Sequence, residues 1–147
     1  LLIDADMRRP RQHLLFHLEN RSGLSSILSN RSQGDEIRRI PSFVDLSVLC
    51  AGPIPPNPQE LLGRPAFAGL LEEMAKEFDV ILVDTPAAIE YSDVQTIAVR
   101  ANGALLVARV QETRLAELQS LAASLAQSGV TVAGSVLNEF AAKRAAR

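Results

Sequence analysis

The chain has 147 residues, of which 47% are hydrophobic, and this composition suits one domain with a sizeable core. Its formal net charge of -2 gives no electrostatic drive toward nucleic acid or an anionic membrane surface. No apolar run reaches the roughly 18 to 20 residues that span a bilayer, and the lone cysteine, Cys50, cannot form an internal disulfide. Composition therefore indicates a cytoplasmic domain and excludes nucleic acid as an expected partner.

Short apolar runs alternate with helical patterns along the chain. The strands are expected at residues 1–3, 46–50, 80–83, 104–108 and 130–137. The helices are expected at residues 57–62, 65–78, 92–100 and 113–128, with Ser92 and Thr113 as N-caps and Gly129 as the last helix end. The runs lack polar alternation, which is typical of parallel strands that helices cover on both faces. We therefore predict an α/β fold with a doubly wound, mainly parallel sheet that is buried on both sides.

Acidic and amide side chains follow three of the predicted strands. Asp4 and Asp6 end the first strand, Asp84 ends the third, and Asn138 ends the last. The carboxyl ends of parallel strands meet at one edge, where converging carboxylates can hold Mg²⁺ directly or through its waters. An apolar run that ends in Asp is also the Walker B arrangement of P-loop enzymes. The competing interpretation is that these side chains only cap turns.

Two motifs together make the sequence similar to one family. The bacterial tyrosine kinases (BY-kinases) have an apolar strand ending in Asp-x-Asp-x-Arg, the Walker A′ motif, and Asp4, Asp6 and Arg8 match it. Their Walker B strand resembles residues 81–86, Ile-Leu-Val-Asp-Thr-Pro. More specific than either motif is the Pro-Asn-Pro-x-Glu-Leu-Leu segment at residues 56–62. The resemblance covers nearly the whole chain.

The resemblance implies a P-loop NTPase-like fold, related to the MinD and ParA ATPases, that binds ATP and Mg²⁺. By that likeness Asp4 would orient or deprotonate a tyrosine hydroxyl and bind metal-held water, and Asp6 would support the same metal shell. Asp84 would hold Mg²⁺ through water, and Asn138 resembles a residue that reads the adenine edge. Arg8 would either pair with a phosphate or fix a neighbouring carboxylate.

Two features of the family are missing from the sequence. It contains no Gly-x-x-x-x-Gly-Lys-Ser/Thr loop, whose amides and lysine bind the phosphates, and no tyrosine from Glu139 to Arg147. We therefore expect residues 1–147 to form a single, N-terminally truncated nucleotide-binding domain, whose first strand and P-loop lie upstream. This chain alone should bind ATP poorly, fail to autophosphorylate and be a monomer or weak dimer. Tyr91, its only tyrosine, is expected to pack or to line the site.

Three functions remain open at this point. The resemblance implies a protein-tyrosine-kinase-like domain that regulates exopolysaccharide or capsule biosynthesis, chain length or export. It would work at the inner face of the bacterial membrane with a transmembrane polysaccharide co-polymerase or activator segment, and would self-associate in the full-length protein. The alternatives are a MinD/ParA-like positioning ATPase and a non-catalytic regulatory domain. Ser92 and Asp93 fit either a helix start or a nucleotide contact.

Overall fold

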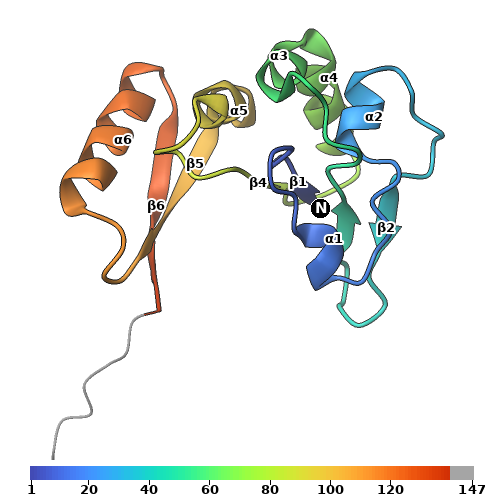
Figure 1. Ribbon diagram of the computed structural model, residues 1–147, viewed down its shortest axis with the longest axis horizontal. Coiled ribbons are helices and arrows are strands. Elements are labelled where there is room, and N and C mark those ends of the chain that lie inside the picture. The colour runs from blue at the N-terminus through green and yellow to red at the C-terminus, as the bar shows by residue number, and fades with distance from the viewer. Residues whose placement is uncertain (140–147) are drawn as a thin grey trace, which may run out of the picture. The chain divides into compact units, whose positions relative to one another are not determined.

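The computed structural model describes residues 1–139, so the tail after Glu139, where no tyrosine occurs, lies outside the described residues. The chain forms two compact units, Leu1–Ala101 and Asn102–Arg147 (Figure 1). Each unit has its own β-sheet. The expectation of one domain over residues 1–147 stays a prediction.

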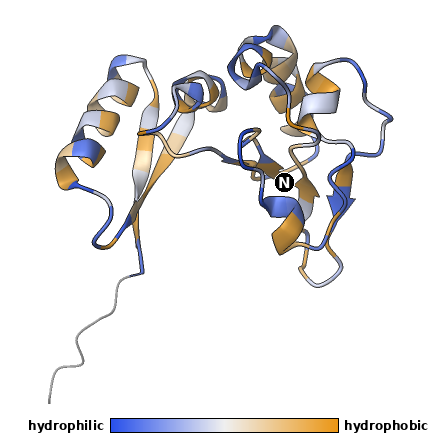
Figure 2. Ribbon diagram, viewed as in Figure 1, coloured by the Kyte–Doolittle hydropathy of each residue, from blue (hydrophilic) through white to orange (hydrophobic). Residues whose placement is uncertain are grey.

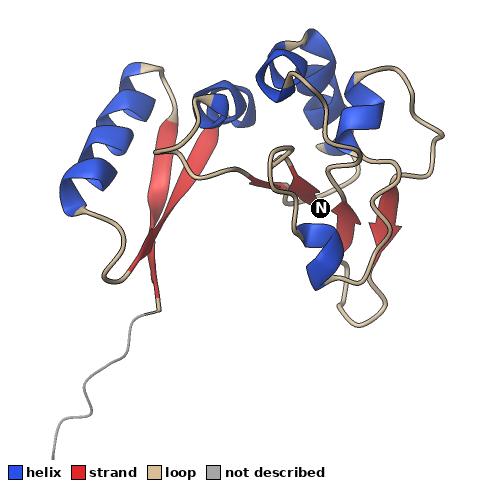
Figure 3. Ribbon diagram, viewed as in Figure 1, coloured by secondary structure: helices blue, strands red, loops and turns tan. Residues whose placement is uncertain are grey.

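The first unit contains a four-stranded sheet in the order β2-β3-β1-β4 (Figure 3). Its strands are β1 (Leu2–Asp4), β2 (Ile37–Arg39), β3 (Ser47–Leu49) and β4 (Leu82–Asp84). β3, β1 and β4 are parallel, as predicted, whereas β2 is an antiparallel edge strand that was not predicted. The apolar run at residues 80–83 forms strand only from Leu82, and the strand includes Asp84.

Five helices belong to this unit. They are α1 (Gln12–Leu15), α2 (Leu24–Leu28), α3 (Pro58–Gly63), α4 (Pro65–Met74) and α5 (Asp93–Ala101). α3 and α4 each begin with proline, whose fixed backbone angle suits the first helical position. α4 ends at Met74 rather than Phe78, because the chain continues as turns whose amides bond back to Leu71, Met74 and Glu73. The short helices α1 and α2 were not predicted.

The sheet of the first unit is covered on both faces at its two central strands. Successive strand residues point to opposite sides, so Ile3 and Leu49 pack into a core with α2, α3, α4 and α5. Val48 and Cys50 pack on the other side, against Phe16 at the end of α1 and its neighbours. Burial raises the pKa of the Cys50 thiol to about 11, with a further contribution from the charge of Asp4. Both faces are thus covered at β1 and β3, whereas Leu82 on the edge strand β4 is 59% exposed.

The second unit contains β5 (Gly103–Arg109), α6 (Leu115–Gln127) and β6 (Thr131–Asn138), with the two strands parallel. Gly129, at φ +76°, ends α6 as predicted, and the Val130 amide donates to the Leu125 carbonyl. The N-cap prediction for Thr113 is wrong. Its hydroxyl instead accepts from the Arg109 amide at 2.9 Å, and α6 starts two residues later.

The β5–β6 pair exposes apolar side chains, and Figure 2 colours these strands mostly from white to orange. The exposed fractions are 56% for Leu105, 63% for Val107, 44% for Val136 and 54% for Leu137. The expectation of a sheet buried on both sides is therefore wrong for these strands in the described structure. The physical reason is that this unit supplies a single helix, α6, as cover.

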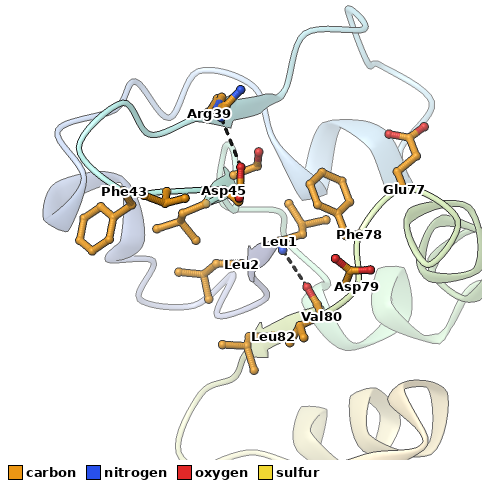
Figure 4. Close-up of a pocket in the computed structure, with 13 residues that line it drawn as sticks. Leu1, Leu2, Arg39, Phe43, Asp45, Glu77, Phe78, Asp79, Val80 and Leu82 are labelled. Atoms are coloured by element: carbon orange, nitrogen blue, oxygen red, sulfur yellow. Dashed lines mark hydrogen bonds and ion pairs between the residues drawn. The ribbon is translucent and has the colours of Figure 1, made fainter.

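A cavity of about 660 Å³ opens at the amino ends of β1, β3 and β4 (Figure 4). Leu1, Leu2 and Leu82 line it, and the Leu1 amino group donates to the Val80 carbonyl at 2.8 Å. This end of the strands is opposite to the one that carries Asp4 and Asp84. The cavity is therefore separate from the predicted site.

Among residues 1–139, none of the helices combines the length and the apolar character that crossing a membrane requires.

Candidate functional site

Asp4 and Asp84 lie side by side at the carboxyl ends of two adjacent parallel strands. They are register partners in the β1–β4 pairing, and the ladder continues through a 2.8 Å bond from the Ala5 amide to the Asp84 carbonyl. The strand end is the place where open α/β sheets bind ligands. The predicted convergence of these two carboxyl-end residues is therefore what the fold produces.

Asp4 is completely buried and is surrounded by backbone donors. Its carboxylate accepts from the amides of Asp6 at 3.2 Å, Arg11 at 3.2 Å and Gln12 at 3.0 Å. Burial raises the pKa of Asp4, and the charge of Asp84 adds to this, while the amide bonds act in the opposite direction. Asp4 thus holds the loop after β1 and the start of α1, which is the turn-capping role that competed with catalysis.

Asp6 is partly exposed and shapes the same loop. One carboxylate oxygen accepts from the Arg8 amide at 3.0 Å and from the Arg9 amide at 2.9 Å. These bonds use only Oδ1. Asp6 therefore presents a second oxygen beside the turn that it stabilises.

Gln12 connects the two strand-end carboxylates, and sequence reasoning missed it. Its main-chain amide donates to Asp4 Oδ2, and its side-chain Nε2 donates to Asp84 Oδ2 at 2.7 Å. A neutral glutamine carries no charge pattern or motif that marks it as functional. Its only signal was its position shortly after the Asp-x-Asp-x-Arg motif.

Arg8 takes the second of the two roles expected for it, fixing a neighbouring carboxylate. Its Nε donates to Asp93 Oδ2 at 2.7 Å and its Nη2 to Asp93 Oδ1 at 3.1 Å, a bidentate pair. Asp93 is 1% exposed at the first turn of α5. The Arg8 guanidinium also lies 4.2 Å from the centre of the Tyr91 ring, so Tyr91 lines this side of the loop.

The carboxylates fit a magnesium ion that keeps most of its waters better than an ion that is held by protein side chains alone. Among the described residues, no group of three or more histidine, cysteine or acidic side chains is arranged to hold a metal. Mg²⁺ usually keeps several waters and binds one or two carboxylates together with substrate phosphates. Asp84 suits that mode, because it is partly exposed and a cation would relieve its repulsion with Asp4.

Asn138 belongs to the second unit, where it ends β6 as register partner of Arg109. Its main-chain carbonyl accepts from the Val110 amide at 3.1 Å, and its side-chain oxygen accepts from the Glu139 amide at 2.9 Å. These contacts stabilise the strand end and the turn after it. The adenine-reading role of Asn138 stays a prediction.

A comparison with models of known protein families gives no match. Among curated proteins, the chain is 36% identical over 140 residues to the putative tyrosine-protein kinase CapB of Staphylococcus aureus. That match covers 95% of the chain and 61% of CapB. The chain is also 35% identical to the tyrosine-protein kinase YwqD of Bacillus subtilis (strain 168), covering 94% of the chain and 58% of YwqD. The chain thus spans about three fifths of the length of these two relatives.

Solved structures give the same result. The kinase domain of the Escherichia coli tyrosine kinase ETK superposes with a TM-score of 0.91 at 33% identity, over 99% of this chain and 57% of that one. The chimerical protein CapA2B2 superposes with a TM-score of 0.88 at 34% identity, over 95% and 62% of the two chains. The α/β fold and the resemblance seen in the sequence are confirmed, because the chain is similar to bacterial tyrosine kinases over nearly its whole length and shares the fold of a solved kinase domain.

Proposed function

We propose that this chain is part of a protein-tyrosine kinase that uses Mg·ATP and regulates exopolysaccharide or capsule biosynthesis, chain length or export. The observation that carries the proposal is the pairing of Asp4 with Asp84 at adjacent parallel strand ends, in a fold shared with a tyrosine kinase domain. Phosphoryl transfer needs positioning and charge stabilisation more than covalent chemistry, and such an edge can provide both.

The carboxylates divide the work according to their exposure. Asp84 holds Mg²⁺ through water, and the bound ion spreads the charge of the transferring phosphoryl group. Asp6, with an oxygen outside the turn, takes the role expected for the buried Asp4: it orients the tyrosine hydroxyl and accepts its proton. Asp4 is buried among backbone amides, and its hydrogen bonds hold the loop after β1 in place. Arg8 and Asp93 fix the other end of that loop.

The phosphate-binding loop is the part that the 147 residues do not contain. Activity is therefore proposed for a protein in which this chain is combined with a phosphate-binding loop. By resemblance, the full-length protein self-associates and works at the inner face of the membrane with a transmembrane co-polymerase or activator segment.

The test is phosphotyrosine formation by the purified full-length protein with Mg·ATP, read by immunoblot and by transfer of radiolabelled phosphate. Asp84→Asn and Asp6→Asn should each lower the rate by about 10- to 100-fold. Asp45→Asn is the matched control, because Asp45 is an exposed carboxylate in the turn before β3 and should leave the rate unchanged. ATP hydrolysis without phosphotyrosine would favour a positioning ATPase, and neither activity would favour a non-catalytic regulatory domain.

A further inference from the structure

We propose that Gln12 is a positioning residue that sets the orientation of the Asp84 carboxylate for a hydrated divalent cation, an inference that rests on the proposed function. The observation is a single residue that bonds to the carboxylates of two neighbouring strand ends at once.

Gln12 is held by its main chain as well as by its side chain. Gln12 is the first residue of α1, and its amide donates to the buried Asp4 carboxylate at 3.0 Å. The preceding amide, that of Arg11, donates to the same oxygen at 3.2 Å. This start of α1 is therefore tied to the end of β1. From that fixed point the side-chain amide meets Asp84 at 2.7 Å, across a sequence separation of 72 residues.

The chemistry of glutamine suits this position. The terminal torsion of an aspartate side chain is broad, so a carboxylate without a donor samples many orientations. The Gln12 amide donates to Oδ2 of the partly exposed Asp84 and thereby restricts the rotation of its carboxylate. Because the donor is neutral, Asp84 keeps its full charge for a cation, whereas a lysine here would neutralise it. A hydrogen bond that fixes a metal-side ligand typically changes metal affinity by 10- to 100-fold.

The experiment measures cation binding directly. Mn²⁺ is titrated into the full-length protein in the presence of ADP, and the free ion is counted by electron paramagnetic resonance. Gln12→Met keeps the length of the side chain and the main-chain bond to Asp4 but has no donor. Gln12→Asn keeps the amide but is one methylene too short to reach Asp84. Gln119→Ala, at an exposed position of α6, is the matched control.

We expect both Gln12 variants to raise the Kd of Mn²⁺ about tenfold. Their thermal midpoints without metal should stay within a few degrees of the wild-type value, and Gln119→Ala should bind normally. Asp84→Asn separates this inference from the function beneath it. If Asp84→Asn binds Mn²⁺ like the wild type, the proposed metal site is wrong and the inference is lost with it.

Two other results would overturn the inference while leaving the proposed function intact. In the first, Asp84→Asn loses Mn²⁺ but both Gln12 variants bind it normally. In the second, the Gln12 variants lose Mn²⁺ only together with a large drop in thermal midpoint, which would make Gln12 a structural anchor of α1.

Discussion

Both units expose apolar side chains, but among the described residues only the unit formed by Leu1–Ala101 buries charged ones. Asp4, Asp93 and Glu36 are 0%, 1% and 7% exposed in the first unit. Leu105 and Val107 are 56% and 63% exposed in the second. A buried charge is tolerated only when it is paired or hydrogen-bonded, so the first unit depends on a set of specific polar contacts.

Among its described residues, the second unit has no buried charged side chain and few buried apolar ones. Its described part has two strands and one helix, and two-stranded sheets are marginal in water without further packing. Among the described residues, buried polar contacts are therefore concentrated in the first unit. Substitutions that remove a buried partner in the first unit should therefore cost more than matched exposed ones.

The largest expected effect is the loss of the Arg8–Asp93 pair. Arg8→Met keeps bulk over Tyr91 but leaves the Asp93 carboxylate buried without its bidentate partner. Breaking a buried pair on one side typically costs about 3–5 kcal/mol. Urea denaturation of the 147-residue chain should show a loss of that size in the free energy of unfolding.

Arg39→Met is the control, because Arg39 and Asp45 pair at 3.3 Å with side chains 74% and 83% exposed. Such a surface pair contributes less than about 1 kcal/mol. Similar losses for the two variants would mean that burial of the Arg8–Asp93 pair has no energetic importance.

The next effect concerns the close contact of Gly23 with the segment after β3. A Cβ at Gly23 would lie 2.2 Å from the Cys50 carbonyl oxygen and 2.5 Å from the Gly52 nitrogen, both backbone atoms. Gly23→Ala should therefore destabilise the chain by about 2–3 kcal/mol through overpacking. Gly69→Ala, in α4 with open space around its Cβ position, should stabilise it by about 0.5–1 kcal/mol. Equal effects in urea denaturation would contradict this steric explanation.

A smaller effect depends on pH and on Glu36. Burial pushes the pKa of Glu36 upward, but bonds from the Gln33 amide and the Ser32 and Ser22 hydroxyls outweigh it, so the pKa lies below its ordinary 4.5. A group whose pKa is lowered on folding stabilises the fold at pH values above its ordinary pKa. This stabilisation is lost as the pH falls through the folded-state pKa.

Glu36→Gln should accordingly cost about 1–2 kcal/mol at pH 7 and less at pH 3. The measurement is the free energy of unfolding against pH for both proteins. Parallel curves for wild type and variant would rule out Glu36 as a source of acid sensitivity.

The strands could be predicted because they are continuous apolar runs. β1, β3, β4, β5 and β6 all overlap predicted runs, and their parallel pairing brings Asp4 next to Asp84. β2 could not be predicted, because Ile37-Arg38-Arg39 is a short, mostly polar edge strand. α2 has five residues and depends on tertiary contact, since the Leu24 amide donates to the carbonyl of Cys50. Periodicity cannot reveal contacts of that kind.

The candidate carboxylates could be named from the sequence, but the residues that contact them could not. Asp4 and Asp84 end strands and Asp6 follows two residues after β1, positions that a motif can mark. The partners of Asp84 and Arg8 are 72 and 85 residues away in the sequence. Gln12 has no charge, and Asp93 fits an ordinary helix start. The sequence around these two residues therefore does not indicate which side chains they contact. Only the fold brings these distant groups together.

The smallest expected effect tests the exposed strands directly. Val107→Thr changes a side chain that is 63% exposed on β5, and threonine has nearly the same shape and suits strands, so the stability should change by less than about 0.5 kcal/mol. Val48→Thr makes the same change at a fully buried position of β3, where an unpaired hydroxyl should cost about 1–3 kcal/mol. Urea denaturation of both variants compares the same substitution, valine to threonine, in the two units. Equal losses would show that the β5 face is covered in the folded protein, because only a buried hydroxyl carries that cost.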